Sequence, residues 1–97
     1  MGPAYKIRPD ALEWLAPHNP RWQQRDGSPH LTNIAFAAAL SPSMLSKTMR
    51  GDQPLTTKVQ AHLVALAMCV GATEEEARAH LFELVAQPHV AEPVVAA

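Results

Sequence analysis

The chain has 97 residues, of which 47% are hydrophobic, and this is enough for the core of one small domain. The apolar residues are mainly Ala, Leu and Val with few aromatics, a mixture that favours short packed helices over a sheet. The formal net charge of −1 excludes an indiscriminate nucleic-acid binder, the lack of an apolar run near about 18 residues excludes a membrane span, and the single cysteine excludes an internal disulfide.

The chain divides into three predicted parts. Residues 1–8 are expected to be a flexible basic arm, residues 9–86 one folded domain, and residues 87–97 a non-helical tail that follows the first of two late prolines. The beginning of the chain lacks the basic-then-apolar pattern of a secretion signal, which predicts a cytoplasmic protein.

Pro9 and Asp10 predict the start of a first helix, because proline fits the first turn and a carboxylate favours the positive end of the helix dipole. Pro17 is expected to end this helix early. Residues 16–30 hold several prolines and are predicted to form a loop or a broken turn of helix, and loops of that length are often functional. Its large or charged side chains are Arg21, Trp22 and Arg25.

The next stretch predicts two short helices joined by a tight turn at Ala39 and Leu40. The second helix is expected to begin after a cap at Ser28 or Thr32 and to run to about Ala39. Its expected buried residues are Leu31, Ile34, Ala35 and Ala38. The third helix is predicted over residues 42–50, with Ser41 as its cap, Pro42 in its first turn and Gly51 as its end.

The third predicted helix separates its side chains into two arcs when it is wound at about 100° per residue. One arc carries small hydroxyls and cations at Ser43, Ser46, Lys47 and Arg50. The opposite arc is expected to be buried and holds Met44, Leu45, Thr48 and Met49. Such a helix suits the major groove of DNA, since Arg and Lys reach guanine O6 and N7 or phosphate, and Ser adapts to several base edges.

Two further helices are predicted. Thr56 or Thr57 is expected to cap a fourth helix that ends near Gly71 and buries Val59, Leu63, Leu66, Ala67 and Val70. Thr73 and Glu76 have the spacing of a capping box and predict a fifth helix, whose apolar stripe is Ala77, Leu81, Leu84 and Val85. Phe82 lies off that stripe, so Phe82 and Val85 are candidates for a homodimer seam. The alternative is that Phe82 covers its own core.

The charges are unevenly distributed along the chain. Residues 1–60 carry a net charge of +3 and residues 61–97 carry −4. A basic part that holds the hydroxyl-and-cation helix, followed by an acidic part, predicts a DNA binder with one face attracted to phosphate and the other repelled. Chance asymmetry in a short chain is the alternative.

Residues 31–67 resemble the helix-turn-helix of the Xre/Cro family of phage and bacterial repressors, and a weaker likeness extends over residues 7–86. The matching positions are Ile34 and Ala35 in the first helix core, the small Ala38, the apolar Leu40, the cap Ser41 and the anchor Leu45. The chain differs from the family at Ala39, where glycine is usual, and at Phe36, where a polar residue is usual. A non-glycine residue in the left-handed region costs about 1 kcal/mol, and Phe36 is expected to be covered by the segment that carries Trp22.

The resemblance implies an all-α, compact five-helix bundle, similar to lambda repressor, with residues 9–86 as the DNA-binding domain. It implies a transcriptional regulator, specifically a repressor of phage or prophage origin, whose partner is a double-stranded DNA operator. The predicted base contacts are Ser41, Pro42, Ser43, Ser46, Lys47 and Arg50, with phosphate or the helix's own carbonyls as the alternative for Arg50. The predicted phosphate contacts are Thr32, Asn33, Gln53, Thr56, Thr57, Lys58, Arg21 and Arg25.

Other functional classes have little support in the sequence. The five histidines and Cys69 lack the spacing of a zinc site, and Cys69 is expected to be an inert buried thiol. No catalytic arrangement or phosphate-binding glycine loop is visible, so we expect no enzyme, no cofactor and no small-molecule ligand. The alternative function is a protein-interaction module, antitoxin-like or adaptor-like, that keeps the same fold but has little affinity for DNA.

Overall fold

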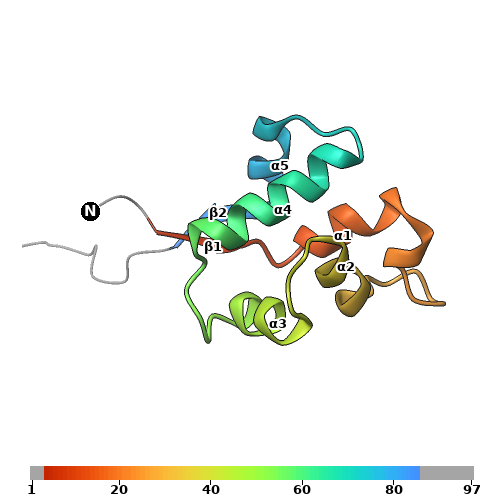
Figure 1. The fold of residues 1–97 in the computed structure, drawn as a ribbon, viewed down its shortest axis with the longest axis horizontal. Coiled ribbons are helices and arrows are strands. Elements are labelled where there is room, and N and C mark those ends of the chain that lie inside the picture. Colours follow the sequence, from red (N-terminus) through yellow and green to blue (C-terminus); the bar gives the residue numbers. More distant parts are fainter. Residues whose placement is uncertain (1–3, 86–97) are drawn as a thin grey trace, which may run out of the picture.

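The computed structural model describes residues 4–85, in which five α-helices surround one core and a short sheet joins the two ends (Figure 1). The α-helices are α1 (Ala11–Leu15), α2 (Leu31–Ala37), α3 (Pro42–Arg50), α4 (Thr57–Cys69) and α5 (Glu74–Leu81), and two 3-10 turns follow α1 at Ala16–His18 and Pro20–Trp22. The strands are β1 (Tyr5–Ile7) and β2 (Phe82–Leu84). The prediction of a mainly helical fold with five helices is confirmed, and the difference from the all-α class is one short two-stranded sheet.

Each strand of the sheet has a charged residue between two apolar or aromatic ones, and the two strands come from opposite ends of the described chain. β1 and β2 pair antiparallel, with Ile7 opposite Phe82 and Lys6 opposite Glu83. Ile7 and Phe82 face the core and are buried, whereas Lys6 Nζ lies 3.4 Å from Glu83 Oε2 on the other face. The prediction of a flexible arm over residues 1–8 is therefore wrong for Tyr5–Ile7.

The sheet also changes the end of the fifth helix. α5 ends at Leu81, and the backbone becomes extended at Phe82, so Leu84 and Val85 do not lie on its apolar stripe. Phe82 is 6% exposed within the core, which makes the prediction of a dimer contact at this residue wrong. Val85 is exposed, and the predicted tail over residues 87–97 lies outside the described residues.

The segment between α1 and α2 is built around a buried tryptophan. Trp22 enters the core, and its carbonyl accepts a hydrogen bond of 2.7 Å from the backbone N–H of His30. The cap of α2 is His30, whose Nδ1 accepts from the backbone N–H of Asn33, so the predicted caps at Ser28 and Thr32 are wrong. Because the tryptophan points into the core, the segment does not cover Phe36, which is 64% exposed.

The turn between α2 and α3 contains the predicted left-handed residue. Ala39 has φ 59°, and two hydrogen bonds close the end of α2, from Leu40 N–H to the Ala35 carbonyl and from Ala39 N–H to the Phe36 carbonyl. This is the Schellman arrangement, with alanine at the position that glycine usually holds. The buried side chain of Leu40 anchors the turn in the core.

The caps predicted for the other helices are confirmed. Ser41 Oγ accepts from Met44 N–H in α3, and Thr56 Oγ1 accepts from Val59 N–H in α4. Thr73 and Glu76 exchange both hydrogen bonds of the capping box in α5. These bonds satisfy amide groups that a helix start leaves without partners.

α4 is the longest helix of the described chain and packs against α5. Its buried residues include Val59, Leu63, Leu66 and Ala67, as predicted, while Val70 is partly buried just beyond the helix. Cys69 is exposed, which corrects the expectation of a buried thiol, because it lies on the side of α4 away from the core. Within residues 4–85, no helix combines the length and the apolar character that crossing a membrane requires.

Candidate nucleic-acid interface

α3 presents the predicted polar arc at the surface. In Figure 1, α2 and α3 lie side by side below α4, and α5 lies on the opposite side of α4. Leu45 and Thr48 anchor α3 in the core, and the hydroxyl of Thr48 donates to the Met44 carbonyl at 2.8 Å, which satisfies its buried polar group. All six residues predicted to contact bases are exposed or half-buried, namely Ser41, Pro42, Ser43, Ser46, Lys47 and Arg50.

The opposite arc of α3 is less buried than its spacing predicts. Met44 is 40% exposed and Met49 is half-buried, so the prediction that all four apolar-side residues are covered is wrong. The short helix contacts the core mainly through Leu45 and Thr48, one turn apart. Two methionine side chains therefore flank the polar arc at the surface or close to it.

Arg50 has defined neighbours at the end of α3. Its Nε donates to Asp52 Oδ2 at 3.1 Å, and its Nη1 donates to Ser46 Oγ at 3.0 Å. It does not bond the carbonyls at the end of its own helix, since Lys47 and Thr48 accept from the backbone N–H groups of Asp52 and Gly51. Asp52 was not among the residues predicted from sequence, although a carboxylate two residues after a helix-ending arginine is a signal for such a pair.

The predicted phosphate contacts at the start of α2 lie together. Thr32 and Asn33 are exposed, and Asn33 Nδ2 donates to the backbone carbonyl of Arg21 at 2.7 Å. This bond fixes the position of Arg21 beside the first turn of α2. It also uses one of the N–H donors of the Asn33 side chain. At the start of α2, the side chains of Thr32 and Arg21 therefore keep more of their donors available to phosphate than Asn33 does. Arg25 is exposed in the turn before Gly27.

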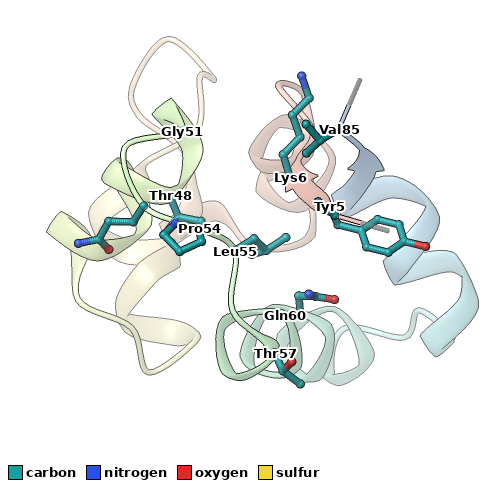
Figure 2. A pocket seen from close by; sticks show the side chains of 11 residues that line it. Tyr5, Lys6, Thr48, Gly51, Pro54, Leu55, Thr57, Gln60 and Val85 are labelled. Atoms are coloured by element: carbon teal, nitrogen blue, oxygen red, sulfur yellow. The ribbon is translucent and has the colours of Figure 1, made fainter. Parts of the chain in front are cut away.

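The other predicted phosphate contacts follow α3. Gln53, Thr56, Thr57 and Lys58 are all exposed, but the hydroxyl of Thr56 is engaged as the cap of α4. Gln53 and Thr57 line an open hollow of about 540 Å³ between this connection and the sheet. Figure 2 shows Pro54 and Leu55 on one side of the hollow, and Lys6 and Val85 on the other.

The side chains that line this hollow carry little charge. Among the described residues that line it, Lys6 carries the charge, and there is no His, Asp, Glu or Cys to move a proton or attack a substrate. In the described part of the chain, no three His, Cys, Asp or Glu residues are grouped as metal ligands would be. The hollow is lined by a mixture of apolar side chains, such as Leu55 and Val85, and polar ones, such as Gln53 and Gln60.

The basic residues fall into two groups. Lys6, Arg8, Arg50 and Arg78 each form an ion pair with a neighbouring carboxylate. The hydrogen bond from Arg8 to Asp10, for example, lowers the pKa of that carboxylate and raises the pKa of the guanidinium. In residues 4–85, no carboxylate pairs with the remaining cations, which are Arg21, Arg25, Lys47 and Lys58. All of these unpaired cations were predicted as DNA contacts.

A second hollow, of about 320 Å³, lies between the end of α2 and α4. Its lining is mostly alanine, and it also includes Leu66, Cys69 and His62, whose Nδ1 lies 2.7 Å from the Ala38 carbonyl. The exposed Phe36 lies in α2, next in sequence to Ala37 in this lining. The α2–α4 side of the molecule is therefore apolar at its surface.

No protein-family model matches the chain, and comparisons with curated proteins and with solved structures likewise return no match. A function for this chain therefore rests on the surface around α3 and on the resemblance of its sequence pattern.

Proposed function

We propose that this chain is a sequence-specific double-stranded DNA-binding protein whose helix α3 enters the major groove. The observation that carries the proposal is the outer arc of α3, where two serines, Lys47 and Arg50 are accessible on a helix held by Leu45 and Thr48. A helix fits the major groove, and these side chains are hydrogen-bond donors suited to guanine and to phosphate. α2 and α3 are then the two helices of a helix-turn-helix.

Four of the cations proposed to contact DNA have no carboxylate partner among residues 4–85, which leaves them available to phosphate. Arg21 and Arg25 come from the segment before α2, Lys47 from α3, and Lys58 from the first turn of α4. The acidic first turn of α5, with three consecutive glutamates, lies on the other side of α4 (Figure 1). A field of this polarity attracts one face of the molecule to phosphate and turns the acidic side away.

The more particular proposal is a transcriptional repressor of phage or prophage origin that acts in the cytoplasm. It rests on the resemblance of residues 31–67 to Xre/Cro proteins. Repression would follow from occlusion, because a domain seated in the major groove of a promoter blocks polymerase or a competing regulator. Bases would be read by residues of α3 and by Ser41 before it, and the phosphate contacts would set register and orientation.

The test begins with selection of binding sites from a random double-stranded DNA library, followed by fluorescence anisotropy on the selected duplex and a scrambled one. We expect tighter binding of the selected duplex, with the preference lost in Lys47→Ala/Arg50→Ala. Arg78→Ala is the matched control, since it removes a cation from α5, on the far side of α4. Equal binding of both duplexes by the wild type, or failure to enrich any site, would refute the proposal.

The apolar α2–α4 side favours a second candidate function, binding to a protein partner. Phe36 is 64% exposed, and the alanine-lined hollow lies beside the end of the same helix. An antitoxin-like or adaptor-like module would form a stable hetero-complex through this side and bind DNA weakly, without a steep salt dependence. Phe36→Ser separates the two functions, because it would weaken a partner complex and leave DNA affinity close to that of the wild type.

A further inference from the structure

The end of α3 places an acidic residue beside its last arginine. Gly51 has φ 83°, and the chain reverses there through two hydrogen bonds, from Asp52 N–H to the Lys47 carbonyl at 2.9 Å and from Gly51 N–H to the Thr48 carbonyl at 3.2 Å. This Schellman arrangement fixes the backbone of Asp52. Its carboxylate is thereby held 3.1 Å from Arg50 Nε.

Two contacts from different directions orient the guanidinium of Arg50. Asp52 accepts from Nε, and Ser46, one turn earlier on α3, accepts from Nη1. Two of the five N–H donors of the guanidinium are then engaged, and the other three remain available to a ligand. Since the Ser46 hydroxyl accepts from Arg50, its own proton is free to be donated. Together, the side chains of Arg50 and Ser46 offer hydrogen-bond donors to a ligand that binds at the end of α3.

Helix stability does not account for Asp52. A carboxylate near the end of a helix is repelled by the negative end of the helix dipole, and an exposed ion pair adds little to stability. Asp52 and Arg50 are both more than half exposed. A carboxylate on the outer end of α3 would also repel DNA phosphate, and this repulsion opposes binding that is independent of sequence.

We infer that Asp52 and Ser46 are positioning residues that orient Arg50 to read a guanine, an inference that rests on the proposed DNA-binding function. The available N–H donors of Arg50 match a base edge that carries hydrogen-bond acceptors. Guanine has such an edge in the major groove, formed by O6 and N7. Adenine presents an acceptor beside a donor, which a donor pair does not match. The operator therefore contains a guanine contacted by Arg50, and Asp52 sets how strictly it is required.

The test uses the selected duplex in which each guanine is replaced, one at a time, by 7-deazaguanine, which lacks the N7 acceptor. Wild-type affinity should fall about 2- to 13-fold at one position, the range expected for the loss of one of the two hydrogen bonds of a bidentate contact, and Arg50→Ala should abolish the difference there. Asp52→Ala and Ser46→Ala should reduce that discrimination by at least threefold, while Asp52→Asn, which keeps an acceptor, should retain more of it. Asp52→Ala should also bind scrambled DNA more tightly.

Glu75→Gln is the matched control, because it removes a negative charge from exposed α5 without touching α3. Thermal unfolding of each variant identifies any loss of fold. The inference is overturned if Asp52→Ala and Ser46→Ala discriminate as the wild type does, or if Arg50→Ala weakens binding equally at every substituted duplex. If the wild type shows no preference for the selected duplex over a scrambled one, the proposed function fails as well.

Discussion

Replacing Ala39 with glycine should stabilise the protein, which is unusual for an alanine next to a helix. Ala39 has φ 59° at the end of α2, in the left-handed region. An L-residue pays about 1–2 kcal/mol to adopt this conformation, and glycine pays almost nothing. Against this gain, glycine adds about 0.4–1 kcal/mol of conformational entropy to the unfolded chain. Ala39 is exposed, so the loss of its methyl group removes little packing.

The net expectation for Ala39→Gly is an increase of about 0.8 kcal/mol in the free energy of unfolding, the middle of a range from zero to about 1.6 kcal/mol, or roughly 3–6 °C in Tm for a domain of this size. Urea titration and calorimetry measure the two quantities. Ala65→Gly is the matched control, since Ala65 is exposed within α4 and the same change there should cost about 1 kcal/mol. If Ala39→Gly destabilises the protein as Ala65→Gly does, the account of strain in this turn is refuted.

Three further changes test other parts of the structure. Lys58→Ala should reduce the slope of the logarithm of the DNA-binding constant against the logarithm of the salt concentration by about 0.9, whereas Arg78→Ala should leave this slope unchanged. Equal slopes for the wild type and Lys58→Ala would show that Lys58 does not contact DNA phosphate. Leu45→Ala should lower the free energy of unfolding by about 2–5 kcal/mol in urea titration, because this side chain is fully buried, while exposed Ser43→Ala should change it by less than about 0.5 kcal/mol. The hydrogen bond from the backbone N–H of Thr73 lowers the pKa of Glu76. The contribution of this carboxylate to stability is therefore present above its unfolded pKa and is lost as pH falls through the lower folded value. The urea midpoint of Glu76→Gln should accordingly fall less than that of the wild type between neutral and acidic pH, and parallel curves would contradict this reasoning.

Local signals in the sequence were sufficient for most helix boundaries. Ser41 with Pro42 and Gly51 predicted both ends of α3, and Thr73 with Glu76 predicted the start of α5. These signals work because each cap joins groups three to five residues apart, so the interaction is complete within one turn of chain. The polar arc of α3 was predictable for the same reason, since side chains on a helix repeat with a fixed period.

The residues whose environment was predicted wrongly depend on contacts between distant segments. Phe82 was a candidate for a dimer seam, with its own core as the alternative, and it lies buried in a strand that pairs with β1 at the other end of the described chain. No period within the fifth helix indicates that pairing. Phe36 remains exposed because Trp22, fourteen residues earlier, enters the core instead of covering it.

The sequence by itself determined most of the helix ends of this protein, among them both ends of α3 and the start of α5, and which residues share the outer arc of α3, because these features are set by hydrogen bonds and side-chain spacing within a few residues. Only the tertiary structure decided that Tyr5–Ile7 and Phe82–Leu84 form a sheet, that Cys69 is exposed, and that four of the basic residues lack a carboxylate partner in residues 4–85. These properties follow from how the elements pack into one core, and packing depends on the whole buried surface rather than on any one segment.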